Sequence, residues 1–193
     1  MNDGKFYNKI ILASASPRRR ELLERANIDF DVQVSDADEI NSSVLPPCEI
    51  AKYNAEQKAL AVSKLNDNRI VLGADTIVVL EGKVYGKPTD LNDARKMLNE
   101  LAGKSHSVFT AIAFAKNNQI LKSEIEESIV KFRDLNSSQI EDYLQKVYVL
   151  DKAGAYAAQE FGSLIIENIA GNFDNVMGLP CSLVKCCIEQ IEE

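Results

Sequence analysis

A serine-rich turn followed by arginines, ASASPRR at residues 13–19, has the residue types of an anion site. Ser16 followed by Pro17 predicts a helix that begins at Pro17 with Ser16 as its N-cap. The unpaired N–H groups and partial positive charge of a helix N-terminus attract anions, and phosphate is the anion we expect here. The candidate phosphate ligands of this turn are Ser14, Ser16, Arg18 and Arg19.

The direction of Arg19 supports this prediction. With about 100° between successive helical residues, Arg19 falls on the apolar side defined by Leu22 and Leu23, and Arg18 falls at its edge. A guanidinium directed towards the protein body needs an anion or another acceptor, and its fork of donors fits phosphate oxygens. The alternative is that Arg19 pairs with an internal carboxylate.

Lys58 is predicted to be buried as well. It lies near the middle of the apolar face of a helix expected over residues 49–65, with Asn54 one turn before it on the same face. A lysine in that position either extends its ammonium group to solvent or meets a buried anion. Because Arg19 is also expected to point inward, we favour the second possibility, a buried anion that Lys58 and Arg19 share.

Asp75 interrupts the apolar, β-branched run at residues 70–80, which predicts a central strand. An ionised aspartate in such a strand needs a partner or a metal ion, so Asp75 is the candidate catalytic or metal-facing carboxylate. Gly73, on the same strand face, would let another backbone or a ligand approach closely. The alternative is that the strand ends at Ala74 and that Asp75 caps a turn.

Other charged stretches give weaker signals. Residues 35–39, SDADE, suit a hard divalent cation, and an acidic surface loop is the alternative. Lys87 lacks the spacing of a Walker A loop but can present an ammonium group to phosphate from a loop. Asp151 and Lys152 open a glycine-bearing loop, where a surface ion pair is the alternative to a site role. His106 has no partner at an informative spacing, and we expect it to be structural.

The elements that must position these residues alternate between strands and helices. Apolar and alternating runs predict strands at residues 10–13, 30–34, 70–80, 105–115, 120–132 and 163–169. Amphipathic patterns predict helices at residues 17–26, 49–65, 89–101, 136–150 and 181–191. At 193 residues the chain is long enough for one core, and we expect a single domain over residues 1–193.

Composition limits the environment and the partners. The chain has 29 acidic and 22 basic residues, and a net charge of -7 argues against general binding to nucleic acid or to anionic membranes. The four cysteines show no CxxC spacing, which favours free thiols in a reducing compartment. The polar N-terminus and the lack of a long apolar stretch predict a soluble, cytoplasmic protein without a membrane span.

Taken together, these motifs resemble the Maf family of nucleoside triphosphate pyrophosphatases. The matching stretches follow the family's order over nearly the whole chain: LASASPRRRELL at 12–23, EQKA at 56–59, GADTIV at 73–78, GKP at 86–88, SHSVFTA at 105–111, DKAGAYAAQ at 151–159 and NVMGLP at 175–180. The combination is highly specific, although GKP alone is not. The acidic loop departs from the SEVEE of many relatives, which favours Glu39 over Asp36 as the family carboxylate.

The resemblance implies hydrolysis of a nucleoside triphosphate between its α and β phosphorus atoms, with Mg²⁺ or Mn²⁺ as the divalent metal cation. By similarity, Asp75 is the proton acceptor, and Glu39 and Asp75 hold the metal. The implied phosphate ligands are Ser14, Ser16, Arg18, Arg19, Lys58, Lys87 and Lys152. The implied fold is α/β, with an elongated, twisted mixed β-sheet flanked by helices and two lobes around a central cleft, as in Maf and ITPase-like proteins.

Three positions distinguish the branches of the family. Arg18, Thr76 and Gln159 resemble the branch that hydrolyses dTTP and UTP, with modified pyrimidine nucleotides as further candidates. A glutamine amide matches the O4 and N3–H edge of a pyrimidine dione. The alternatives are a 7-methyl-GTP pyrophosphatase and a nucleotide-binding regulator of cell division or septum formation. A homodimer is usual in the family.

Overall fold

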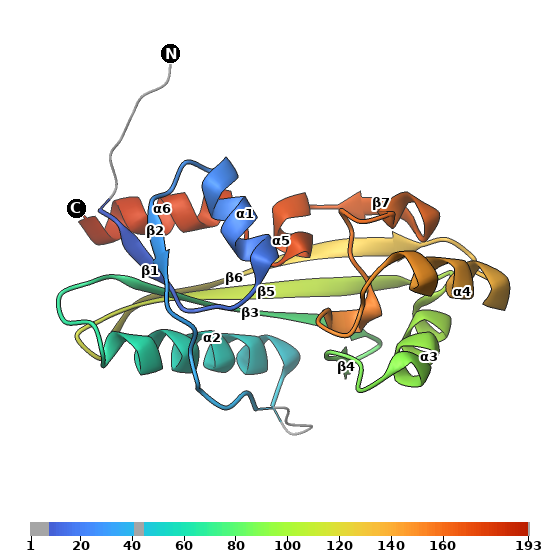
Figure 1. Ribbon diagram of the computed structural model, residues 1–193, viewed down its shortest axis with the longest axis horizontal. Helices are drawn as coiled ribbons and strands as arrows, with labels where there is room; N and C mark the ends of the chain where they lie inside the picture. Colours follow the sequence, from blue (N-terminus) through green and yellow to red (C-terminus); the bar gives the residue numbers. More distant parts are fainter. Residues whose placement is uncertain (1–7, 41–44, 193) are drawn as a thin grey trace, which may run out of the picture.

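The computed structural model is an α/β structure built around a seven-stranded mixed sheet (Figure 1). It describes residues 8–40 and 45–192. Most of the polar N-terminal segment on which the cytoplasmic prediction was based lies outside these residues. The strand order is β2-β1-β3-β5-β6-β7, and β4 pairs with β3. The strands are β1 (Ile10–Leu12), β2 (Phe30–Val32), β3 (Val71–Leu80), β4 (Lys83–Tyr85), β5 (Ser105–Lys116), β6 (Gln119–Phe132) and β7 (Ile166–Ala170).

Helices cover both faces of this sheet. Figure 1 shows α2 along one face, α1, α5 and α6 on the other, and α3 and α4 at the far end. The helices are α1 (Pro17–Arg25), α2 (Pro47–Ser63), α3 (Leu91–Leu101), α4 (Ser137–Lys146), α5 (Phe173–Met177) and α6 (Cys181–Glu192), with short 3-10 turns at Ala153–Ala155 and Gly162–Leu164. No helix among the described residues is long and apolar enough to cross a membrane.

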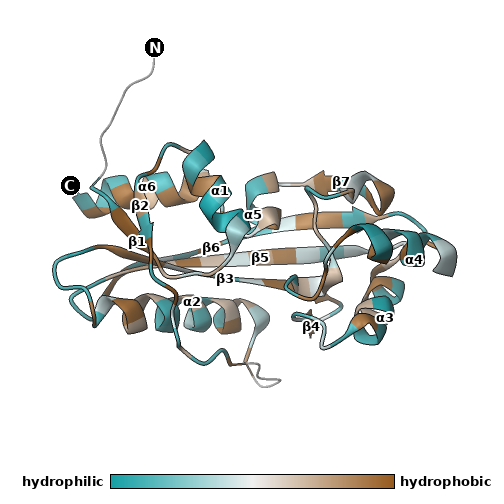
Figure 2. Ribbon diagram, viewed as in Figure 1, coloured by the Kyte–Doolittle hydropathy of each residue, from teal (hydrophilic) through white to brown (hydrophobic). Residues whose placement is uncertain are grey.

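Alternation along the central strands builds the core on both faces. Ile112 and Phe114 of β5 pack with residues of α1 and α6, whereas Ala111 and Ala113, which alternate with them in sequence, pack with the alanines of α2. Figure 2 shows apolar stretches along the strands and polar residues along the helices. The small residues on the α2 face allow that helix to lie close to the sheet.

Gly73 is the point of closest approach between α2 and β3. A Cβ atom at Gly73 would lie 2.2 Å from the Ala55 carbonyl oxygen and 2.7 Å from the Ala59 nitrogen, so only glycine fits. The predicted close approach at Gly73 is therefore made by the backbone of α2. It brings the residues beside these two alanines, Asn54 and Lys58, within reach of β3.

One edge of β3 is left unpaired in its middle. β1 pairs in parallel with β3 at Val71 and Leu72, and β4 pairs with β3 at Val78 to Leu80. Among the strands of the described residues, none pairs with residues 73–77 on this side, although β5 pairs with them on the other side. This open edge follows the carboxyl end of β1, where the turn into α1 begins.

Most predicted elements are confirmed; they differ from the prediction at their ends, and one short helix was not predicted. The helix predicted to 65 ends at Ser63, where the Asn66 side chain donates to the Val62 carbonyl at 2.8 Å, so Leu65 is 74% exposed rather than packed. The helix predicted to 150 ends at Lys146, because the β-branched residues that follow are extended. The strand predicted from 163 begins at Ile166, and α5 was not predicted.

The start of α1 agrees with prediction except for the cap. The helix begins at Pro17, but Ser16 makes no side-chain capping bond; its N–H donates to Ser14 Oγ at 3.3 Å instead. At the other end the C-cap is Ala26, and Asn27 follows in a left-handed conformation.

His106 is buried away from the open edge of β3, as a structural histidine should be. Its Nε2 atom lies 2.9 Å from the Tyr156 hydroxyl, and its ring packs edge-on against Phe132. Burial lowers the pKa of His106 to about 4, so the ring is neutral at physiological pH.

Candidate active site

A cleft of about 810 Å³ opens along the unpaired edge of β3. Its walls come from the turn before α1, the acidic loop after β2, α2, β3 and the loops that follow β4, α4 and α5. All the candidate residues line it, namely Ser14, Ser16, Arg18, Arg19, Glu39, Lys58, Asp75, Thr76, Lys87, Lys152 and Gln159. Asp36 does not, which agrees with the choice of Glu39 as the site carboxylate.

We call the turn before α1 together with Arg19 the α1 wall. Arg19 donates from Nε to the Gly178 carbonyl at 2.8 Å, from Nη1 to Ser14 Oγ at 3.0 Å and from Nη2 to Thr76 Oγ1 at 3.1 Å. These acceptors are neutral, and Arg19 forms no ion pair within the described part of the chain, so the alternative of an internal carboxylate partner is wrong. Burial lowers the pKa of Arg19, and the charge of Asp75 opposes that shift.

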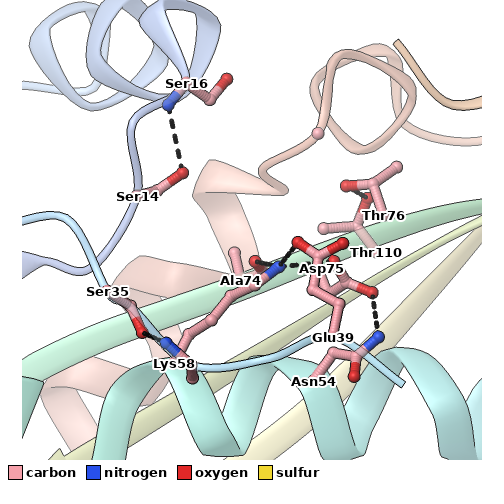
Figure 3. A network of polar contacts seen from close by, with 12 residues as sticks. Ser14, Ser16, Ser35, Glu39, Asn54, Lys58, Ala74, Asp75, Thr76 and Thr110 are labelled. Carbon is pink, nitrogen blue, oxygen red and sulfur yellow. Dashed lines mark hydrogen bonds and ion pairs between the residues drawn. The ribbon is translucent and has the colours of Figure 1, made fainter. Parts of the chain in front are cut away.

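We call Glu39, Lys58 and Asp75 the α2 wall. Lys58 Nζ lies 2.7 Å from Glu39 Oε1 and 2.7 Å from Asp75 Oδ1, between the two carboxylates (Figure 3). Its side chain is only 11% exposed, so the alternative of an ammonium extended to solvent is wrong. Burial raises the pKa of Glu39, but the hydrogen bond and charge of Lys58 outweigh that effect and lower it overall.

Asp75 itself lies inside β3, so the alternative in which the strand ends at Ala74 is wrong. It is buried, with 7% of its surface exposed. Its partner across the sheet, Ala111 of β5, has no polar side chain, and the charge of Asp75 is compensated by Asn54 and Lys58 of α2, outside the sheet.

A third group closes the cleft from the loop after α4. Arg18 Nη1 lies 3.0 Å from Asp151 Oδ2, and Lys152 Nζ lies 2.9 Å from Asp151 Oδ1. Burial raises the pKa of Asp151, but Lys152 and Arg18 outweigh it, so the net shift is downward. The local ion pair given as the alternative therefore exists, but Lys152 is buried and the pair also connects to Arg18 of α1 across the cleft. Lys152 is 5% exposed and donates to the Tyr148 carbonyl.

The remaining candidates lie around these groups. Lys87 Nζ is 4.0 Å from Glu39 Oε1 and its side chain is 59% exposed, which places it at the rim. Thr76 Oγ1 lies 3.0 Å from Thr110 Oγ1 in addition to accepting from Arg19. Gln159 donates from Nε2 to Glu160 Oε1 at 3.2 Å.

The residues of the α2 wall fit a divalent cation that is shared with a substrate. No group of three or more His, Cys, Asp or Glu side chains that could hold a metal occurs within residues 8–40 and 45–192. Two carboxylates on either side of an ammonium group, facing a cleft lined by cations, nevertheless suit Mg²⁺, which takes one or two carboxylates, waters and substrate phosphate oxygens.

Three groups that contact cleft residues were not predicted from the sequence. The Gly178 carbonyl, presented by a glycine at φ +111°, accepts from Arg19, although NVMGLP marked the region. Asn54 was placed on the correct helix face without a role, and it contacts Asp75. Glu160 holds the Gln159 amide, and no pattern in the sequence indicated this contact.

A solved structure of another protein shares this fold. The solved structure titled the Staphylococcus aureus Ham1 protein superposes with a TM-score of 0.55 at 16% identity, covering 96% of this chain and 100% of that chain. At this level of identity the likeness concerns the fold alone, and it agrees with the predicted ITPase-like arrangement of the sheet and its helices.

The family follows from sequence comparison. A family model described as Maf-like protein matches residues 9–191, and the chain belongs to the Maf family. A protein of Akkermansia muciniphila named dTTP/UTP pyrophosphatase is 45% identical over 93% of this chain and 94% of its own length. A protein of Bacillus cereus strain G9842 with the same name is 43% identical over 95% of this chain and 96% of its own length.

Proposed function

We propose that this protein is a pyrophosphatase that hydrolyses dTTP and UTP to the monophosphate and pyrophosphate. The observation that carries the proposal is the opposition of the two walls across one cleft, with Arg19 bound to neutral acceptors on one side and the Lys58-bridged carboxylates on the other. The names of relatives at 45% and 43% identity over nearly the full chain support the same substrates.

In this mechanism the α1 wall binds the phosphates. Arg19 is already held in place by the Gly178 carbonyl, Ser14 and Thr76, so little side-chain freedom is lost when a phosphate arrives. Its positive charge forms no ion pair with a carboxylate in residues 8–40 and 45–192, and it stabilises the negative charge of the polyphosphate. Lys87 at the rim and Lys152 in the loop after α4 add positive charge along the cleft.

The α2 wall activates the water. Asp75 accepts the proton of the attacking water as its oxygen bonds to phosphorus and the bond to the leaving phosphate oxygen breaks. Glu39 and Asp75 would hold the divalent cation, which neutralises phosphate charge and lowers the pKa of bound water. Lys58 pairs with both of these carboxylates and adds a positive charge beside the bound phosphates.

We propose that Arg18, Thr76 and Gln159 select the pyrimidine substrate. Thr76 orients Arg19 rather than contacting the base directly, since its hydroxyl bonds to Arg19 and Thr110. Gln159 is the base-contacting candidate, because its amide offers both a donor and an acceptor for a pyrimidine dione edge. Arg18 is tied to Asp151 and helps to join the two sides of the cleft around the substrate.

The test is release of pyrophosphate and monophosphate from dTTP, UTP, CTP, GTP and 7-methyl-GTP, each with Mg²⁺, with Mn²⁺ and with EDTA. Metal-dependent release that prefers dTTP and UTP is the expected result. Preference for 7-methyl-GTP would overturn the specificity and keep the mechanism. Binding of all nucleotides without turnover would favour the regulatory alternative. The family's homodimer stays a prediction, and sedimentation of the purified protein measures it.

A further inference from the structure

Asn54 makes contacts that none of the proposed roles explains. It lies on α2 one turn before Lys58 and is only 4% exposed (Figure 3). Its Nδ2 donates to Asp75 Oδ2 at 3.2 Å and to the Ile40 carbonyl at 3.1 Å, and its Oδ1 accepts from the Ile40 N–H at 2.9 Å. Asparagine is a poor helix former and a buried amide is unfavourable without partners, so these bonds account for its presence.

Asn54 and Lys58 both connect the same two segments, strand β3 at Asp75 and the acidic loop after β2. Each takes a different oxygen of Asp75, since Lys58 Nζ lies 2.7 Å from Oδ1 and Asn54 Nδ2 lies 3.2 Å from Oδ2. Each also takes one of two consecutive residues of the acidic loop: Lys58 pairs with the Glu39 side chain, and Asn54 with the backbone of Ile40.

The attachments made by Lys58 and by Asn54 differ in how a bound substrate and cation would affect them. A divalent cation held by Glu39 would compete with Lys58 for that carboxylate, so the Lys58–Glu39 ion pair is the attachment open to exchange. The bonds between Asn54 and Ile40 involve a neutral amide and a backbone peptide group, neither of which is a ligand for metal or phosphate in the proposed mechanism. They therefore persist when the ion pair is exchanged.

We propose that Asn54 is a positioning residue that fastens the acidic loop to Asp75 and keeps the Glu39 and Asp75 carboxylates in register during the reaction. This inference rests on the proposed function. Asn54 does not belong to the α1 wall, so its loss leaves the phosphate contacts of Arg19 in place. A displacement of about 1 Å in a reacting group can lower a rate about a hundredfold, so the effect falls on turnover.

The experiment replaces Asn54 by leucine, which has a similar volume and no hydrogen-bonding group, and by alanine, which cannot clash. Ser63→Ala is the matched control, because Ser63 lies on the same helix, is fully buried and accepts the Asn118 N–H at 2.9 Å, away from the cleft. We expect kcat for dTTP to fall about 10- to 100-fold in both Asn54 variants, with KM changed less than about threefold. Ser63→Ala keeps wild-type kcat.

A second readout does not depend on activity. Hydrogen exchange of the Ile40 amide in the absence of nucleotide should become at least about tenfold faster in both Asn54 variants and stay unchanged in Ser63→Ala. Wild-type kcat in a folded Asn54→Leu protein, or unchanged exchange at Ile40, overturns the inference. An equal loss of kcat in Ser63→Ala also overturns it, because general destabilisation would explain both. If wild type hydrolyses no nucleotide, the proposed function fails, and the exchange experiment still decides whether Asn54 holds the loop.

Discussion

The α1 wall and the α2 wall face each other across one cleft, and each contains a partly buried cation. In the α1 wall, Arg19 donates to a carbonyl and two hydroxyl groups, and no carboxylate among the described residues forms an ion pair with it. In the α2 wall, Lys58 lies between two carboxylates, which leaves one net negative charge. The difference shows that burial does not by itself determine what a cation does.

This contrast gives each wall its own ligand. In the proposed mechanism, the guanidinium held in a fixed orientation receives the phosphates, whereas the carboxylate pair bridged by Lys58 would receive the cation. A substrate that carries both a polyphosphate and a divalent cation satisfies both walls at once. The two walls can be separated experimentally because they are built from different helices.

The largest effect is expected in the α2 wall from Asp75→Asn, which keeps the shape of the side chain and removes the base. We expect kcat to fall by about 10² to 10⁴ because general base catalysis is lost. Affinity for a non-hydrolysable dUTP analogue, measured by calorimetry, should stay near wild type, since the α1 wall is intact. Normal turnover in this variant would show that the two walls do not divide the work in this way.

In the α1 wall, Arg19→Ala should weaken phosphate binding. Loss of a charge-assisted contact corresponds to about 2 kcal/mol or more, or roughly thirtyfold in kcat/KM. The matched control is Arg25→Ala at the other end of α1, where the side chain is 53% exposed and pairs with Asp174 at 2.8 Å. Steady-state kinetics of both variants measures the difference, and equal activity in the two would contradict the assigned role of Arg19.

Glu39→Gln tests whether the α2 wall receives the cation. The amide keeps an acceptor for Lys58 but loses the charge that attracts metal, so the Mg²⁺ concentration for half-maximal activity should rise at least about tenfold. Titration of activity with Mg²⁺ at saturating dTTP measures the shift. A Mg²⁺ requirement equal to that of wild type would mean that the cation is held without Glu39.

The smallest effect concerns stability in acid. The pKa of Glu39 is lowered in the folded protein, so its stabilising contribution is complete above its ordinary value of 4.5 and is lost as the pH falls through the lower folded value. Since its side chain is 45% exposed, we expect wild type to lose under about 1 kcal/mol more than Glu39→Gln between about pH 6 and about pH 3. Urea unfolding at the two pH values measures this difference, and a larger loss in the variant would contradict the sign.

The sequence was sufficient to predict that a charged residue needs a partner where its position in a helix or strand directs it into the protein. Lys58 on an apolar face and Asp75 in an apolar strand both required a partner, and the structure supplies each with the other. Arg19 on an apolar side was predicted to meet an acceptor, and three neutral acceptors are present. In these cases the periodic pattern of apolar residues already shows a charged residue on an apolar face, so a single sequence is enough to detect it.

Contacts that depend on distant backbone could not be predicted in the same way. The Gly178 carbonyl and the Ile40 peptide group carry no side-chain signal, because every residue has the same backbone donor and acceptor. The open edge of β3 likewise follows from where β1 stops pairing and β4 begins, which depends on the register of three separate segments. Helix ends were missed by two to four residues where a side chain or a β-branched run ended the helix.

Gly73 shows what this architecture implies for inherited variation. It touches no proposed ligand, yet a methyl group there would collide with the backbone of α2 and displace the helix from the strand. The amide and ammonium groups that reach Asp75 would move with the helix. In a mutational scan, Gly73 would therefore score with the catalytic residues, and a search for active-site positions by loss of function would return a residue whose only contribution is the absence of a side chain.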